Sequence, residues 1–181
     1  VGVYYKIRTG ANKAKLTLAP IVNYRDFHSM NTDHYFNLKQ SNNRNKVKLV
    51  IDENSQTPIY MRLSEGNYIE HYNDTFSNMF YIEEEKRGFY PEENHCVPGV
   101  YEVEIPARQE KEISFVCSLE ENIEQVDVKD LINKEITRLG KLFNESLLID
   151  FKKDKKTKKE LNEEEFIKQF IIATDNFVVY R

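Results

Sequence analysis

The sequence lacks several features by which common functional classes are recognised. Tryptophan is absent, cysteine occurs only at Cys96 and Cys117, and glycine occurs six times in 181 residues. With so few glycines, the chain has no glycine-rich loop to cradle a phosphate group. The two cysteines form no C-x-x-C pair and no disulfide framework, so the sequence favours a reducing, cytoplasmic compartment.

Long apolar segments and an excess of positive charge are also missing. No apolar run approaches the ~20 residues of a membrane span, and the chain does not open with the charged and apolar regions of a signal peptide. The formal net charge of −4 disfavours nucleic acid and anionic membranes, because both would be repelled on average. We therefore expect a soluble protein with no nucleic-acid or membrane partner and no cofactor.

What is present is the composition of one ordinary globular domain, with 40% hydrophobic and 31% charged residues. Between Val3 and Phe115 the apolar side chains recur with a period of two, which is typical of half-buried β-strands. We expect strands at Val3–Arg8, Lys15–Pro20, His34–Leu38, Val47–Ile51, Ile59–Leu63, Tyr68–Tyr72, Met79–Glu83, Gly99–Ile105 and Glu112–Cys117. Because no long helical stretch separates them, these strands predict antiparallel pairing in a mainly β fold, a β-(super)sandwich.

After Glu120 the period changes to about 3.6, which predicts two C-terminal helices. Asp127 and Asp130 are placed to cap the first helix, and Asn162 with Glu165 has capping-box spacing ahead of the second. Between them, the six lysines of residues 152–159 predict a solvated loop. The apolar positions are Val128, Leu131, Ile132, Ile136, Leu139, Leu142 and Phe143 in the first helix, and Phe166, Ile167, Phe170, Ile171, Ala173 and Phe177 in the second.

These patterns predict three regions along the chain. They are a β-sandwich at 1–120, a linker helix with the lysine-rich loop at 121–160, and the start of a helical domain at 161–181. The chain begins within a strand pattern and stops within a helical one. We therefore expect a fragment of a longer protein, whose further residues cover the broad apolar face of the second helix.

The densest polar cluster lies in a predicted loop at residues 23–34. Loops at the ends of a sandwich often carry function. The candidate contacts to a substrate or to a neighbouring domain are Asn23, Tyr24, Arg25, Asp26 and His28. Alternatively, Arg25 and Asp26 fix the loop itself by charge-assisted hydrogen bonds.

A metal site is the less favoured interpretation of this cluster. His28 and His34 are six residues apart, with Asp26 and Asp33 beside them. Zinc requires three or four convergent ligands, and this spacing in a loop does not ensure convergence. We expect no metal.

A second polar cluster, at residues 87–99, is predicted to form a loop between strands. Its neighbouring carboxylates Glu92 and Glu93 would point to opposite faces of an extended chain, which does not suit the opposed pair of a glycosidase. We expect one of them to be buried against Arg87. Ser29 and Cys96 have histidine neighbours in sequence but no nucleophile elbow and no recognisable base with its orienting group. The chain therefore shows no catalytic site of its own.

Three passages carry a resemblance to a known family. Residues 16–28 read LTLAPIVNYRDFH, residues 78–99 read NMFYIEEEKRGFYPEENHCVPG, and residues 173–181 read ATDNFVVYR. They resemble, in order, an L-x-P-x-x-x-x-R-D-x-H passage, an N-x-x-Y…E-x-x-R-G-L-D-x-x-E-D-x-x-x-P-G passage and an A-A-D-Q-F-x-V-x-R helix of the bacterial and archaeal type of glycogen-debranching enzyme, the amylo-α-1,6-glucosidases. In the second passage the matching residues are Asn78, Tyr81, Arg87, Gly88, Glu93, Pro98 and Gly99. Phe76 stands where the family carries Trp, and Asn94 where it carries Asp.

The resemblance implies a β-supersandwich packed on an (α/α)6 barrel that hydrolyses α-1,6-linked glucose branches. It implies that the catalytic carboxylates lie beyond Arg181, so this chain alone should be inactive. The implied partners are that barrel, in the same protein, and an α-glucan such as glycogen. The residues of the second passage, Asn94 included, would then be structural.

Two other functions remain open. One is an autonomous carbohydrate-binding module, in which tyrosine rings stack on sugar faces, although the lack of tryptophan is unfavourable to it. Its candidate rings are Tyr24, Tyr35, Tyr72 and Tyr90. The other is a protein-interaction domain that docks a partner on the apolar face of the last helix.

Overall fold

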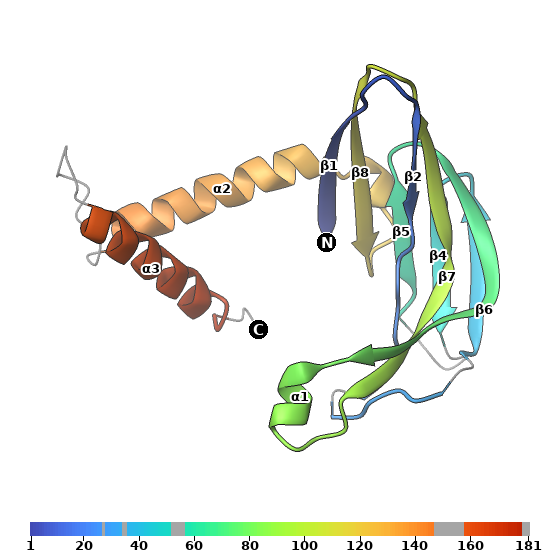
Figure 1. Cartoon of the computed structure of the whole chain (residues 1–181), viewed down its shortest axis with the longest axis horizontal. Helices are drawn as coiled ribbons and strands as arrows, with labels where there is room; N and C mark the ends of the chain where they lie inside the picture. Colours follow the sequence, from blue (N-terminus) through green and yellow to red (C-terminus); the bar gives the residue numbers. More distant parts are fainter. Residues whose placement is uncertain (27, 34–35, 52–56, 147–157, 179–181) are drawn as a thin grey trace. The chain divides into compact units, whose positions relative to one another are not determined.

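The computed structural model describes residues 1–26, 28–33, 36–51, 57–146 and 158–178. It divides the chain into two compact units, Val1–Val128 and Lys129–Arg181. The first unit is built from β-strands and the second from helices (Figure 1).

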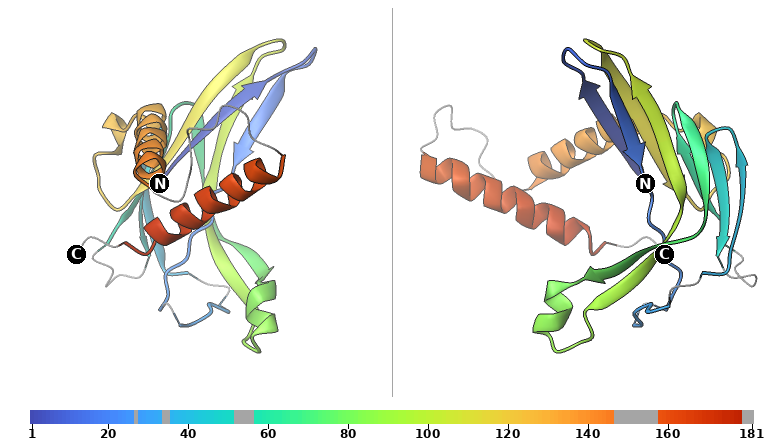
Figure 2. Two further views of the ribbon diagram at one scale, coloured as in Figure 1. Left: turned by 90° about the vertical axis from the view of Figure 1, so that its left-hand side faces the viewer. Right: turned by 45° about the vertical axis from the view of Figure 1, so that its right-hand side comes forward.

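The first unit contains two antiparallel sheets (Figures 1 and 2). The five-stranded sheet has the order β1-β8-β5-β4-β3 and the three-stranded sheet the order β2-β7-β6. The strands of the larger sheet are β1 (Gly2–Arg8), β8 (Glu110–Ser118), β5 (Ile59–Leu63), β4 (Lys46–Ile51) and β3 (Leu38–Asn43). Those of the smaller sheet are β2 (Ala14–Leu18), β7 (Glu92–Ile105) and β6 (Asn67–Phe80). These pairings confirm the prediction of a mainly β, antiparallel sandwich.

The core lies between the two sheets because alternate residues of each strand point toward the other sheet. In β4 the buried positions are Val47, Leu49 and Ile51, with exposed or half-buried residues between them. Tyr101 of β7 lies in the centre of this core and has no exposed surface. On the opposite face of the larger sheet, Tyr60 packs in a second cluster of buried side chains, with Val116, Ile123 and Val128.

The strand predictions before β7 were wrong at three places. The predicted strand Met79–Glu83 is instead the end of β6 followed by helix α1 (Ile82–Lys86), whose glutamates and lysine are good helix formers. The 14-residue strand β6 runs through the predicted gap after Tyr72, with irregularities in its register between Glu70 and Asp74 and between Phe76 and Met79. A strand was also predicted at His34–Leu38, but β3 begins only at Leu38. Residues 34 and 35 of that prediction lie outside the described part of the chain.

The two predicted C-terminal helices are confirmed as α2 (Val128–Glu145) and α3 (Lys158–Asp175). Helix α2 follows the short 3-10 turn η1 (Ile123–Gln125) and begins directly after Asp127. Helix α3 begins four residues before Asn162, so this residue lies within the helix and the predicted capping box does not start it. Most of the lysine-rich run, residues 152–157, lies outside the described residues. Among the described helices none is long and apolar enough to span a membrane.

Candidate functional site

A cleft of about 620 Å³ opens in the first unit between the loop at residues 23–33 and the region of α1. Strands β6 and β7 extend past the sandwich and carry α1 at their end (Figure 1). The cleft volume lies within the ~300–1,000 Å³ of typical small-molecule pockets. The lining residues are Arg25, His28, Ser29, Met30 and Thr32 on one wall, and Glu84, Arg87, Phe89 and Tyr90 on the other.

The first wall is an irregular loop held to β7 by backbone hydrogen bonds. Val22 pairs with Cys96, and the amide of Asn94 donates to the carbonyl of Asn31 at 2.7 Å. Within the loop, Asp26 Oδ1 accepts a hydrogen bond of 2.9 Å from the amide of His28, as aspartate does in tight turns. This wall therefore has a defined backbone without belonging to a sheet.

The second wall is the turn that joins β6 to β7 through α1. The amide of Tyr81 donates to the carbonyl of Pro91 at 2.8 Å and closes the base of this turn. Gly88 follows α1 with a φ of +78°, a left-handed conformation that glycine adopts without strain. The chain then presents Phe89 and Tyr90, which are 63% and 57% exposed.

Glu93 of β7 lies beneath the cleft and is only 1% exposed. Its Oε1 accepts hydrogen bonds from Arg25 Nε and from the amide of Asn31 (3.1 Å), and its Oε2 accepts from Arg25 Nη2 (3.4 Å) and Tyr81 Oη (3.0 Å). Burial alone would raise the pKa of Glu93, but the hydrogen bonds from Arg25, Asn31 and Tyr81 outweigh it and hold the pKa below its ordinary value. For Tyr81, burial and the bond to this carboxylate raise the pKa.

His95 adds a further member to the same network. Its Nε2 lies 3.1 Å from Tyr81 Oη and 3.7 Å from Glu93 Oε2. Because the Tyr81 hydroxyl donates its hydrogen to Glu93, its oxygen accepts from His95, which assigns a proton to Nε2. The result is a continuous chain of donors that ends on the buried carboxylate.

Asn94 uses both ends of its side-chain amide. Its Oδ1 accepts from the amide of Asn78 at 2.9 Å, and its Nδ2 donates to the carbonyls of Thr32 (2.9 Å) and Asp33 (3.3 Å). Asn78 has a φ of +58°, at the irregularity near the end of β6. Asn94 belongs to β7, and its side-chain amide thus links the loop of the first wall to β6.

The charged groups of the cleft are paired with one another. Arg25 is paired with Glu93, and Arg87 Nη1 lies 3.4 Å from Glu84 Oε1. The exposed aromatic rings supply apolar surface, while guanidinium and imidazole groups supply hydrogen-bond donors. This combination suits an uncharged ligand rich in hydroxyl groups better than an anion.

The structure brings several predicted residues to the cleft. Arg25, His28 and Arg87 line it, whereas Tyr81, Glu93 and Asn94 lie behind its lining. The alternative role for Arg25 is also present, because its Nη1 donates to the carbonyl of Asp26 at 3.0 Å.

Other predicted residues lie elsewhere. Tyr24 is about half exposed and is not among the lining residues. Asn23 has a structural role, since its Oδ1 accepts from Asn31 Nδ2 at 3.1 Å. Pro98 and Gly99 lie farther along β7, where Gly99 pairs with Glu70 of β6.

Two expectations about residues 87–99 were wrong. This segment is not wholly a loop, because β7 begins at Glu92. The buried carboxylate is Glu93, as the alternation of strand side chains allows, but its partner is Arg25 rather than Arg87. The pair joins residues 68 positions apart, which local patterns cannot reveal.

Sequence reasoning missed several residues of this site, among them Asn31, Glu84, Phe89 and His95. The period of two offered a signal for His95, since it lies two residues after Glu93 and thus on the same face of the strand. No comparable signal marks the other three. Within the described ranges no three His, Cys, Asp or Glu side chains are grouped to hold a metal ion, and His34 lies outside those ranges.

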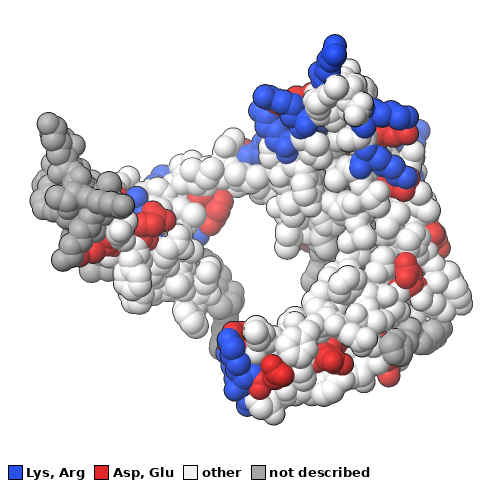
Figure 3. Space-filling view, in the orientation of Figure 1, with Lys and Arg blue, Asp and Glu red and all other residues white. Residues whose placement is uncertain are grey.

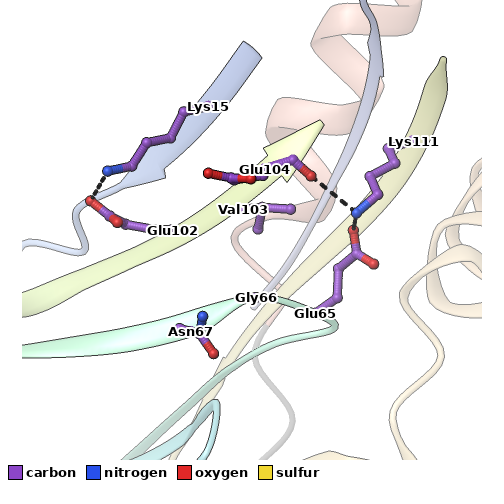
Figure 4. A pocket seen from close by; sticks show the side chains of 8 residues that line it. All are labelled: Lys15, Glu65, Gly66, Asn67, Glu102, Val103, Glu104 and Lys111. Atoms are coloured by element: carbon purple, nitrogen blue, oxygen red, sulfur yellow. Dashed lines mark hydrogen bonds and ion pairs between the residues drawn. The ribbon is translucent and has the colours of Figure 1, made fainter. Parts of the chain in front are cut away.

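A second pocket, of about 400 Å³, lies in the same unit where β2, β6 and β7 meet the start of β8 (Figure 4). Lys and Arg side chains gather at the end of this unit that carries the β1–β2 and β7–β8 connections (Figure 3). In the pocket, Lys15 pairs with Glu102 at 2.6 Å and Lys111 with Glu65 at 2.5 Å. Its cations are thus engaged by neighbouring carboxylates, and none of its lining residues in the described part of the chain is aromatic.

Comparison with known proteins identifies the family. The model of the glycogen debranching enzyme N-terminal region matches residues 1–112. The chain belongs to this family. No curated protein and no solved structure matches it.

The matched region of this debranching-enzyme N-terminal domain contains both walls of the cleft and the buried Glu93. It ends within β8, so α2 and α3 lie outside it. The resemblance seen in residues 16–28 and 78–99 is therefore confirmed at the level of the family.

Proposed function

We propose that this chain is the non-catalytic N-terminal part of a glycogen-debranching glycoside hydrolase, and that its cleft binds α-glucan. In this proposal a helical barrel of the same protein hydrolyses the α-1,6-glucosidic branches. The β unit supports that barrel and adds a glucan contact of its own. Free thiols at Cys96 and Cys117 fit a reducing, cytoplasmic location.

The main observation in favour of glucan binding is that one cleft contains both exposed aromatic rings and arginines whose charges are balanced by carboxylates. Glucose has apolar C–H faces that stack on aromatic rings, and hydroxyl groups that accept from donors such as guanidinium. Phe89 and Tyr90 offer rings in the same cleft as the donors of Arg25 and Arg87. Because both arginines already have carboxylate partners, a phosphate would gain little over a neutral sugar.

The second unit supports the barrel part of the proposal. Large apolar side chains are exposed on its helices, at Leu131, Ile136, Phe166 and Phe170. Exposed apolar side chains of this size favour an interface with another domain. The similarity of residues 173–181 to the helix that begins the family's barrel is consistent with such a neighbour.

Affinity electrophoresis tests the glucan contact. The chain is run in native gels with and without glycogen, beside an inert protein of similar size. We expect glycogen to retard it, and Tyr90→Ala to remove most of this retardation, because the ring supplies stacking surface. Tyr72→Ala is the matched control, since Tyr72 is 87% exposed and is not among the residues that line the cleft.

Unchanged mobility of the wild-type chain in glycogen would contradict the glucan contact and leave only a supporting role. Equal loss of retardation in the Tyr90 and Tyr72 variants would place binding outside the cleft. Retardation that only Tyr90→Ala reduces supports the proposal.

A further inference from the structure

The buried carboxylate of Glu93 contacts both walls of the cleft. On β7 it occupies a fixed position in the register, opposite Met79 of β6. Its two oxygens together accept four hydrogen bonds from groups outside its own strand. Glu93 is 1% exposed, and each of its carboxylate oxygens accepts two hydrogen bonds, so it fixes the positions of the groups around it.

The contact to the first wall is twofold. Arg25 reaches Glu93 through Nε and Nη2, the planar, two-point geometry typical of guanidinium and carboxylate. The amide of Asn31 reaches the same carboxylate from the other end of the loop. Glu93 therefore holds both ends of the segment that contributes His28, Ser29 and Met30 to the cleft.

The contact to the second wall passes through Tyr81. Its hydroxyl donates to Glu93 Oε2 at 3.0 Å, and its backbone closes the turn that carries α1. The carbonyl of Tyr81 also accepts from the amides of Glu84 and Glu85, in the first turn of that helix. Phe89 and Tyr90 thus lie in a turn whose first residue, Tyr81, is hydrogen-bonded to the carboxylate of Glu93.

We infer that Glu93 is a positioning residue of the glucan cleft, which sets the spacing between the Arg25 wall and the Phe89–Tyr90 wall. This inference rests on the proposed glucan contact. Glu93 itself need not touch the sugar. Its effect on binding passes through Arg25 and Tyr81.

The chemistry requires a carboxylate at this position. Glutamine has the same shape but only one acceptor oxygen, and its NH₂ group would face donors of Arg25 and Tyr81. Glu93→Gln should therefore loosen both walls together. Tyr81→Phe removes one hydroxyl and leaves the ring, and should loosen the second wall alone.

The experiment compares the glycogen affinity of these two variants with that of the wild type and of one control variant. Gel retardation is measured over a range of glycogen concentrations, at a temperature where circular dichroism shows each variant folded. We expect Glu93→Gln to weaken binding about tenfold, and Tyr81→Phe to weaken it by a smaller factor of about three. Glu104→Gln, a change at an exposed glutamate farther along β7 that does not line the cleft, should bind as the wild type does.

A spectroscopic signature separates positioning from general destabilisation. In the wild type, the Nε–H of Arg25 should give a resolved ¹H–¹⁵N resonance, because the bond to Glu93 slows its exchange with water. This resonance should disappear in Glu93→Gln and persist in Glu104→Gln. Tyr81→Phe should keep it, because that variant leaves the Arg25 contact intact, and it remains an informative second variant if Glu93→Gln does not fold.

The possible failures are distinguishable. If the wild-type chain is not retarded by glycogen, the proposed function fails first. If Tyr90→Ala weakens binding while folded Glu93→Gln and Tyr81→Phe bind as tightly as the wild type, the glucan contact stands and the positioning role is overturned. Loss of the Arg25 resonance with unchanged affinity would also overturn it.

Discussion

Tyr68 of β6 donates a hydrogen bond of 2.8 Å from its hydroxyl to Gln40 Oε1 of β3, and so joins the two sheets of the sandwich. Gln40 Nε2 donates in turn to the carbonyls of His71 (3.0 Å) and Pro98 (2.9 Å), which belong to the smaller sheet. One glutamine on the edge strand of the larger sheet thus forms hydrogen bonds with three polar groups of the smaller sheet. Because these groups are partly buried, losing their partner is costly.

Gln40→Glu tests this connection with almost no change of shape. A carboxylate cannot donate to the two carbonyls, and it brings negative charge against them. We expect the variant to lose about 1–3 kcal/mol of the free energy of unfolding at pH 7, measured by urea denaturation. The exposed neighbouring change Ser41→Ala should cost less than about 0.5 kcal/mol, and equal losses in the two variants would refute the connection.

Tyr101→Phe should be neutral or slightly stabilising at pH 7. The Tyr101 hydroxyl is buried and has no hydrogen-bond partner among the described residues, while its ring packs 4.9 Å from that of Tyr68. Burial raises the pKa of Tyr101 above its ordinary value near 10. The neutral phenol therefore contributes stability that is present below about pH 10 and is lost as the pH rises further.

The matching measurement is the thermal midpoint between about pH 8 and 11. Above pH 10 the thermal midpoint of Tyr101→Phe should fall less than that of the wild type, because the variant lacks one buried titrating group. Tyr68→Phe should already be destabilised at pH 7, because it leaves Gln40 without a donor. A large loss at pH 7 in Tyr101→Phe would show that its hydroxyl has a partner.

Gly99→Ala should destabilise the sandwich strongly. A Cβ at this position would lie 2.3 Å from the carbonyl oxygen of Ile69 and 2.6 Å from the ring of Tyr68. Relief requires β6 and β7 to move apart, at a cost of about 2–3 kcal/mol in chemical denaturation. Gly10→Ala is the control, since nothing lies within 4 Å of its added methyl group, and a Gly99 variant as stable as this control would contradict the close strand approach.

Asn94→Asp should lower stability by about 1–3 kcal/mol at pH 7. Aspartate cannot donate to the carbonyls of Thr32 and Asp33, although it keeps the acceptor for the amide of Asn78. The same exchange at exposed Asn43 is the matched control for the added charge. Hydrogen exchange should locate the loss in the loop at residues 23–33, and a uniform loss over the whole unit would not fit this explanation.

Sequence patterns predicted the local parts of the fold. The alternation of Val47, Leu49 and Ile51 correctly indicated a strand with one buried face, because burial on a sheet has a period of two. The sequence patterns did not predict helix α1. Met79, Phe80 and Tyr81 form an apolar run, which is typical of a strand that continues into the glutamates after it. The order of strands in the sheets also stayed out of reach, since it depends on contacts between distant residues.

The candidate site was only partly predictable for the same reason. The polar loop around Arg25 and the motif around Glu93 were each visible as local clusters. Their pairing was not, because 68 residues separate them and Arg87 was an equally suitable partner for the carboxylate. Tyr90 was one of four candidate sugar-stacking rings, but Phe89 was not a candidate. That both rings line one cleft depends on the turn after α1, which lies opposite that loop.

The most direct test of the central claim is a titration of the ¹⁵N-labelled chain with maltoheptaose, followed by ¹H–¹⁵N NMR. We predict that the largest shift changes fall on amides of both cleft walls, at residues 25–32 and 84–90. The amides around the second pocket, at Lys15 and Glu102, should change little. Absence of changes, or changes confined to residues outside the two walls, would contradict a glucan-binding cleft in this domain.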